Sequence, residues 1–226
     1  MKKFTLIISL FFPVVLFAQY SPQEIKKYKI SKLIKLSANA DSSETWNQTI
    51  LYDRSGNDTA VYMGDSLYMR FVYEFNSKEK IAKKVTYKYD RSEVETAEYI
   101  YKPDGSYTIS NKDKSYGMTD YTYYDKTGKV TKTQSPDGAQ RIYTYDAKGK
   151  LLGIKSKPGG DGVLTDIKYT YNDKGQCTKE VSKGEYKWTT SNTYDSKGLL
   201  IRSITISTDG EEQTKTSNSY KYEFWK

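Results

Sequence analysis

The chain has 226 residues, a net charge of +8, 36% hydrophobic residues and no histidine. This hydrophobic share is below the roughly 45–50% of ordinary globular domains, so a thick aliphatic core is excluded. The absence of histidine excludes His-based catalytic triads, His metal sites and His proton shuttles.

Residues 1–19 are predicted to be a secretory signal peptide. Lys2 and Lys3 precede an apolar run at residues 4–17, the order that export signals have. The run is shorter than the roughly 20 apolar residues that a membrane-spanning helix needs, and Pro13 interrupts it. We therefore expect a mature chain without a transmembrane helix that is secreted, periplasmic or at the cell surface.

The cysteine count and the distribution of basic residues limit the disulfides and the binding partners that this chain is expected to have. Cys177 is the single cysteine, so an exported chain of this sequence is expected to be stable without an intramolecular disulfide. The basic excess is mild and spread along the chain, with no nucleic-acid reader motif, so no nucleic-acid partner is expected. Lysines on exposed strand faces and edges would discourage aggregation.

The mature chain, residues 20–226, is predicted to be a single β-repeat domain that opens with a short helix at residues 22–28. Ser21 suits a helix cap, Pro22 suits the first turn, and Glu24 follows three residues after the cap. Tyr28 and Ile30 could equally begin the first strand, and that alternative stays open.

Residues 45–112 are predicted to hold degenerate repeats. Apolar rings alternate along this stretch, as at Phe71, Tyr73 and Phe75, and a period of two is the signature of a strand. Two of its turns carry Glu79 and Glu93 where the later repeats have glycine. Those turns need another geometry or a positive φ on a residue with a Cβ.

Residues 116–226 hold the clear repeats, of which the best copy is Tyr145-Asp146-Ala147-Lys148-Gly149-Lys150-Leu151. Asp-x-x-Gly between alternating segments is typical of a type I turn closed by a glycine bulge. Similar copies begin at Tyr124, Tyr171 and Tyr194. The predicted fold is therefore all-β, an elongated antiparallel meander of about 14 to 16 strands in an open or curved sheet.

This motif, preceded by Pro136-Asp137-Gly138, resembles the YD repeat of RHS-type proteins over the second half of the chain. The resemblance implies a β-repeat architecture, an exported location and ligand binding, often suggested as carbohydrate. Large members of that family close long arrays into a shell, and we expect too few units here for closure. The family motif is structural and carries over no catalytic residue.

Alternating tyrosines form the candidate binding surface, because each pair places two rings on one face of a strand. Such rings could bind sugars or extended peptides, or could simply form the core through cross-strand pairs. The candidate ligand-binding aromatics are Trp188, Tyr186, Tyr169, Tyr171, Tyr143 and Tyr145.

The function predicted from the sequence is a non-enzymatic exported scaffold or binding protein, with a carbohydrate or protein partner and no cofactor or metal. One alternative is a polysaccharide hydrolase with a carboxylate pair, such as Glu93 with Glu95 or Glu211 with Glu212. Most other acids occupy turn positions that backbone hydrogen bonds explain. The second alternative is an outer-membrane barrel, which needs an apolar outward band.

Overall fold

The computed structural model describes residues 22–39, 45–159, 165–184, 187–209 and 212–226. Within them the chain forms one short helix, α1 (Pro22–Tyr28), followed by sixteen strands. The strands are β1 (Ile30–Asn39), β2 (Thr45–Tyr52), β3 (Asp58–Met63), β4 (Ser66–Phe75), β5 (Ile81–Lys88), β6 (Glu93–Tyr101), β7 (Tyr107–Asp113), β8 (Thr119–Tyr124), β9 (Val130–Gln134), β10 (Gln140–Tyr145), β11 (Leu151–Lys157), β12 (Thr165–Tyr171), β13 (Cys177–Gly184), β14 (Lys187–Tyr194), β15 (Leu200–Asp209) and β16 (Glu212–Phe224).

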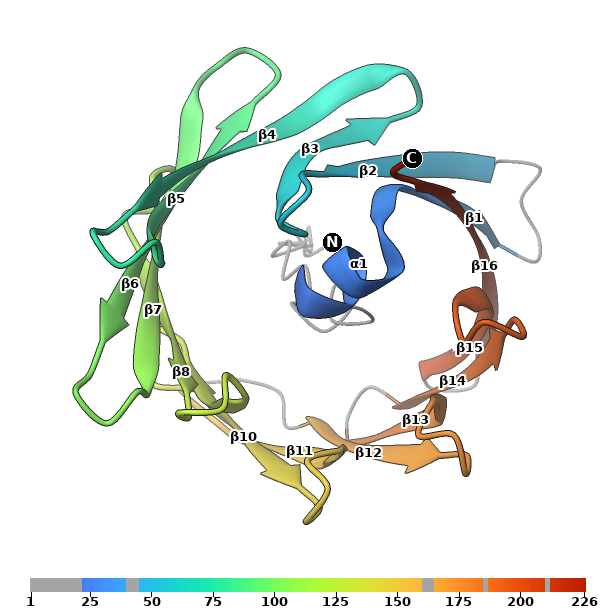
Figure 1. Cartoon of the computed structure of the whole chain (residues 1–226). Helices are drawn as coiled ribbons and strands as arrows, with labels where there is room; N and C mark the ends of the chain where they lie inside the picture. The colour runs from blue at the N-terminus through green and yellow to red at the C-terminus, as the bar shows by residue number, and fades with distance from the viewer. Residues whose placement is uncertain (1–21, 40–44, 160–164, 185–186, 210–211) are drawn as a thin grey trace, which may run out of the picture.

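The strands form a closed antiparallel barrel, in which each strand pairs with its neighbours in sequence (Figure 1). The predicted hairpin meander is confirmed, but the predicted open or curved sheet is wrong. Closure comes from β16, which pairs with β15 along one side and with β1 along the other. Strand twist and tilt accumulate over sixteen strands until the two edges meet, and pairing removes both edges.

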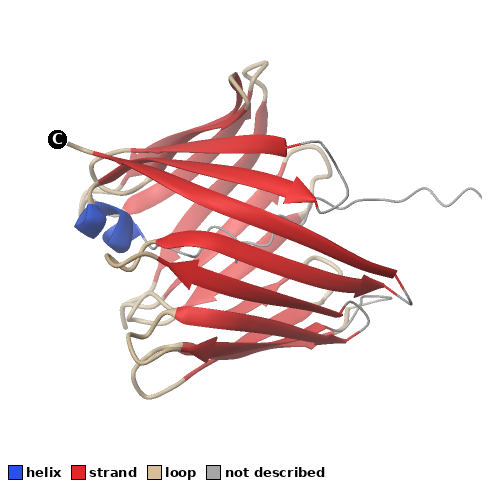
Figure 2. Cartoon of the chain, turned by 90° about the vertical axis from the view of Figure 1, so that its right-hand side faces the viewer, coloured by secondary structure: helices blue, strands red, loops and turns tan. Residues whose placement is uncertain are grey.

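The connections after the even-numbered strands lie at one end of the barrel, together with α1 and the C-terminus (Figure 2). The turn at residues 146–150 is representative. The backbone N–H of Asp146 donates to the carbonyl of Lys150 at 2.9 Å, and Gly149 has a φ of 82°. The Asp146 carboxylate accepts from the N–H groups of Lys148 and Lys150. This is the turn that the sequence predicted, and Gly128, Gly175 and Gly198 occupy the same position in their turns.

The degenerate turns keep this geometry with other residues. Glu79 takes a φ of 57° in a turn closed by the same backbone hydrogen bonds, from Asn76 to Lys80. The prediction that Glu93 would stand at the glycine position is wrong. That turn spans residues 88–92 and is closed by a backbone hydrogen bond from the N–H of Lys88 to the carbonyl of Ser92. Its residue with positive φ is Arg91, at 65°. Glu79 and Arg91 therefore adopt a backbone conformation that is unfavourable for residues with a Cβ.

Helix α1 lies inside the barrel, near the end that holds these turns (Figure 1). Its Ile25 packs with Ile30 and Leu199 in a buried cluster, against which Tyr222 of β16 also packs. The turn at Gly56 lies so close to α1 that an added Cβ would come within 2.1 Å of the Pro22 carbonyl oxygen. Among the described residues, no helix has the length and apolar character to cross a membrane.

The contact of Tyr222 with α1 identifies the inner face of β16. Directly paired residues on neighbouring strands share a face, so the register carries this assignment around the barrel. Leu33 pairs with Tyr222, and Ile50 pairs with Leu33. Most of the alternating tyrosines consequently line the lumen, whereas Tyr87, Tyr121 and Tyr123 lie on the outside with most strand lysines.

Candidate ligand-binding site

The tyrosine that ends an even-numbered strand has a structural task. The hydroxyl of Tyr171, the last residue of β12, donates to the carbonyl of Leu151, the first residue of β11, at 2.8 Å. Equivalent bonds to the preceding strand are made by Tyr101, Tyr145, Tyr194 and Tyr222. Each bond satisfies a carbonyl at the bulge beside a turn, so the tyrosine of the repeat stabilises the hairpin end.

A second row of tyrosines lies two residues deeper in the lumen. Its member Tyr99 stacks on Tyr107 with ring centroids 6.4 Å apart, and Tyr107, which lies at the level of the strand ends, stacks on Tyr124, the last residue of β8, at 4.4 Å. Further along this row, the Tyr143 hydroxyl has Thr133 as partner, and the Tyr220 hydroxyl lies 3.1 Å from the Ser203 hydroxyl. Burial raises the pKa of the Tyr99, Tyr124 and Tyr143 phenols, so these three stay neutral at ordinary pH.

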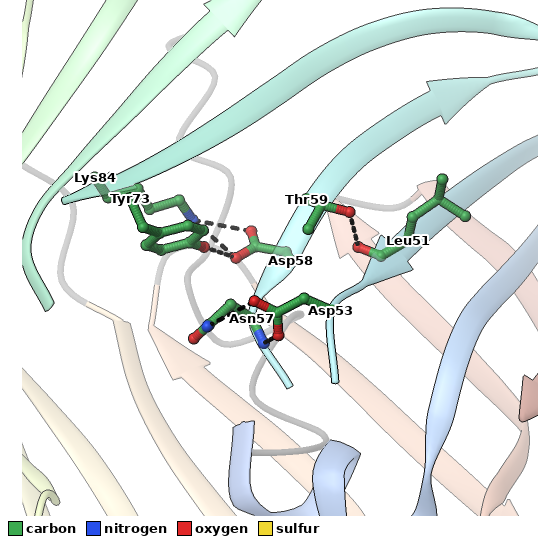
Figure 3. A network of polar contacts seen from close by, with 7 residues as sticks. All are labelled: Leu51, Asp53, Asn57, Asp58, Thr59, Tyr73 and Lys84. Atoms are coloured by element: carbon green, nitrogen blue, oxygen red, sulfur yellow. Dashed lines mark hydrogen bonds and ion pairs between the residues drawn. The ribbon is translucent and has the colours of Figure 1, made fainter. Parts of the chain in front are cut away.

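On one wall of the lumen a deep tyrosine belongs to a complete polar network (Figure 3). The hydroxyl of Tyr73 in β4 hydrogen-bonds to Asp58 in β3, and the Lys84 ammonium in β5 lies 2.9 Å from an Asp58 carboxylate oxygen. The same ammonium lies over the Phe71 ring at 4.1 Å. Tyrosine, lysine and carboxylate therefore satisfy one another without a ligand.

On the other wall the lumen contains a cavity of about 480 Å³. Helix α1 contributes Glu24 and Tyr28 to its lining, and strands β12–β14 contribute Tyr169, Glu180 and Asn192. We call this cavity the chamber. Its volume falls within the roughly 300–1,000 Å³ of small-molecule sites in proteins.

Two residues of the chamber depart from the repeat of the neighbouring hairpin. Where the deep row has Tyr143 in β10 and Tyr169 in β12, β14 has Asn192, and the missing ring leaves space. Opposite Tyr143 the inward residue is Ile154, which is 1% exposed, but opposite Tyr169 it is Glu180. An amide and a carboxyl thus stand where the neighbouring hairpin has a ring and an aliphatic side chain.

Two residues that line the chamber carry buried polar atoms. The Tyr169 hydroxyl and the Asn192 Oδ1 are buried and make no hydrogen bond within the described part of the chain. Burial raises the pKa of the Glu180 carboxyl, although the Asn192 amide favours its ionised form. Native structures rarely leave buried polar atoms unpaired, so these two atoms are expected to bind an ordered water or a ligand.

The structure places five of the six predicted aromatics on the inner face, including Trp188, whose partner Ser182 pairs with the inward residue Ile167. Tyr169 and Tyr171 line the chamber, while Tyr143 and Tyr145 lie on the neighbouring hairpin. Trp188 lies away from them, in a more open depression of about 650 Å³ toward the other end of β14. The sixth residue, Tyr186, falls outside the described residues.

Of the predicted carboxylate pairs, the structure describes both members of one, Glu93 and Glu95. Glu93 accepts from the Thr96 hydroxyl and lies 3.3 Å from the Lys114 ammonium, whereas Glu95 lies on the inner face. A bulge at the start of β6 puts these two carboxyls on opposite sides of the sheet. Glu211 lies outside the described residues. No group of three or more Cys, Asp or Glu side chains in the described ranges is arranged to hold a metal ion.

The sequence prediction missed the polar residues of the chamber: Glu180, Asn192 and Cys177. One signal could have found them. Asn192-Thr193-Tyr194 departs from the Tyr-x-Tyr pattern that ends β6, β10 and β12, and Glu180 stands where the preceding hairpin has the apolar Ile154. Burial also raises the pKa of the Cys177 thiol to about 11, so its thiolate is scarce at neutral pH.

Residues 124–161 match the RHS Repeat family, which confirms the resemblance found in the motif at Tyr124 and Tyr145. No curated protein matches the sequence.

Among solved structures, the barrel is similar to a porin-like protein from Bacteroides uniformis. That match has 13% sequence identity and a TM-score of 0.56, and it covers 87% of this chain and 97% of the other. The Tc holotoxin pore of Photorhabdus luminescens also matches, with 12% identity and a TM-score of 0.33, over 72% of this chain and 12% of that one.

Proposed function

We propose that this chain is a non-enzymatic, exported binding protein that holds a carbohydrate ligand in the chamber beside α1. The single observation that carries the proposal is the pair of unpartnered polar atoms on Tyr169 and Asn192 in a cavity of about 480 Å³. Tyrosine rings supply flat apolar surface for a sugar ring, and the amide, hydroxyl and carboxyl supply directional hydrogen bonds. Export rests on the signal peptide predicted at residues 1–19.

The outer face supports a barrel that functions in water. Lys155, Lys168 and Lys179 are exposed on the outer faces of β11, β12 and β13. A lysine on the lipid face of a membrane barrel costs roughly 2–4 kcal/mol at the bilayer midplane. Purification of the mature chain without detergent supports this placement, whereas heat-modifiable mobility in detergent would favour the outer-membrane alternative.

Ligand binding is tested with the mature chain on a glycan array, followed by calorimetry on the glycans that bind. Tyr169→Ala removes a chamber ring and is expected to weaken binding about tenfold. The contact of one aromatic ring with a ligand contributes about 1–1.5 kcal/mol to the binding free energy. Tyr121→Ala removes a ring that is 38% exposed on the outer face and should leave binding unchanged. Equal effects of both variants would contradict a site in the chamber.

The single cysteine gives an independent readout, because Cys177 lines the chamber. A bound ligand is expected to slow alkylation of Cys177, measured by mass spectrometry. The reaction is followed at alkaline pH, because the pKa of about 11 leaves little thiolate at neutral pH. Unchanged alkylation at saturating ligand would place the binding site elsewhere.

Hydrolysis is the competing function, since Glu24 of α1 and Glu180 line the same chamber. Glycosidases use two carboxyl groups that flank the scissile bond. The glycans that bind are therefore incubated with the chain, and reducing ends are measured. Our proposal predicts no release above that of a Glu180→Gln variant.

A further inference from the structure

The chamber contains three hydrogen-bond acceptors on three adjacent strands. Glu180 of β13 pairs directly with Tyr169 of β12 and, on its other side, with Thr190 of β14. Asn192 follows two residues after Thr190, so it lies on the same inner face as a diagonal neighbour of Glu180. All three side chains line the same cavity.

Each of these acceptors has unused capacity. The Asn192 amide nitrogen donates to the carbonyl of Cys177 at 3.0 Å, and its Oδ1 has no donor within the described residues. The Tyr169 oxygen is unpaired within the described residues. Glu180 forms no salt bridge there, in contrast to Asp58 across the lumen.

We propose that the ligand of the chamber is an amino sugar whose primary ammonium group is held by Glu180, Tyr169 and Asn192. This inference rests on the proposed function and names its ligand class. An ammonium group has three N–H donors and no acceptor, which matches three acceptors on residues that line one cavity. It also supplies the positive charge that a buried carboxylate needs, and the ring of Tyr169 adds a favourable cation–π surface.

The other charged groups of the chamber agree with this ligand. Glu24 on α1 contributes a second negative charge to the lining. Lys174 and Lys197 also line it, but both belong to turns at the barrel end and are exposed to solvent, where their repulsion is screened. The charge buried on the wall itself is that of Glu180.

The test compares three β-1,4-linked oligosaccharides of equal length, built from glucosamine, N-acetylglucosamine or glucose, which differ only at carbon 2. Binding of each to the mature chain is measured by calorimetry at near-neutral pH. The glucosamine oligomer is expected to bind at least about tenfold more tightly than the other two. Equal or tighter binding of the uncharged oligomers would overturn the ammonium inference while leaving carbohydrate binding intact, and binding of none would overturn the proposed function.

Two variants locate the preference. Glu180→Gln keeps the side-chain shape and is expected to weaken binding of the glucosamine oligomer roughly 30-fold or more. The substitution removes one partner of the proposed charge pair. It should leave the glucose oligomer within a few-fold of wild type. Asn192→Leu removes a second acceptor and should weaken the glucosamine oligomer by about tenfold.

The matched control is Glu98→Gln, the same chemical change at an exposed acid on the outer face of β6. It should leave all three affinities unchanged. Circular dichroism of each variant confirms that the barrel has folded. A Glu180→Gln chain that folds and still prefers glucosamine would contradict the proposed role of this carboxyl.

Discussion

Two walls of the lumen carry the same kind of pair with opposite outcomes. On β4 and β5, Tyr73 stands opposite Lys84, and on β12 and β13, Tyr169 stands opposite Glu180. Asp58 of β3 supplies the counter-charge and the hydrogen-bond acceptor for the first pair. The second pair has no such neighbour within the described residues. Lys84 therefore has a structural role because the fold provides its partner, whereas we propose that Glu180 finds its partner in a ligand.

The largest expected effect comes from breaking the satisfied wall. Asp58→Ala leaves the Lys84 ammonium without its counter-charge and the Tyr73 hydroxyl without its acceptor. The side chains of Lys84 and Asp58 are 21% and 30% exposed, so solvent reduces the cost below that of a fully buried pair. We expect a loss of about 2 kcal/mol in the free energy of unfolding, measured with urea.

Glu98→Ala, at an exposed outer-face acid, is the control for this change and should stay within about 0.5 kcal/mol of wild type. If Asp58→Ala were equally mild, the network on β3–β5 would contribute nothing, and the contrast between the walls would fail.

A smaller effect separates two tyrosines of the same strand. Tyr171→Phe removes a hydroxyl that donates to the Leu151 carbonyl, and should lower the free energy of unfolding by about 1 kcal/mol. Tyr169→Phe removes a hydroxyl without a partner in the described residues, and should be neutral or stabilising. Thermal or urea unfolding of both variants measures the difference, and a larger loss for Tyr169→Phe would indicate a hidden partner.

Much of the fold could be predicted from the sequence because turns are local. The Asp and Gly of residues 146–149 specify the hydrogen bonds and the positive φ that reverse the chain, and alternation specifies which rings share a face. Closure could not be predicted, because the period of two is the same in an open sheet and in a barrel. It depends on the pairing of β1 with β16, and on contacts such as the Ser37 hydroxyl with Asn218, 181 residues apart.

The candidate site was predicted only in part, for a related reason. Tyr169 and Tyr171 were identified because they belong to the repeat, whereas Asn192 and Glu180 are departures from it. A departure gains meaning only when the register shows that both face one cavity. The repeat therefore specifies the scaffold, and its interruptions specify the site.

The smallest expected effect on stability comes from Glu180, and its dependence on pH has a distinctive sign. Burial raises the pKa of the Glu180 carboxyl, so the folded chain holds this proton more tightly than the unfolded chain does. Its neighbours on the wall, Tyr169 and Cys177, have raised pKa values too and stay neutral at ordinary pH. Stability linked to Glu180 is then complete below its unfolded pKa of about 4.3 and falls as the pH rises through the folded value.

Glu180→Gln removes this dependence. We expect the variant to melt at a higher temperature than wild type at neutral pH, with the gap closing toward pH ~4, as measured by calorimetry across pH. Asp58→Ala is expected to lower the stability at neutral pH instead, because the Asp58 carboxylate already has Lys84 as its partner. A saturating ligand with an ammonium group should reverse the order of wild type and Glu180→Gln, so that wild type melts at the higher temperature. The ligand stabilises only the chain that keeps the Glu180 carboxylate. A substitution that stabilises the free protein and weakens its complex marks a group held in place for binding, and the same melting experiment with and without the glucosamine oligomer decides whether Glu180 is such a group.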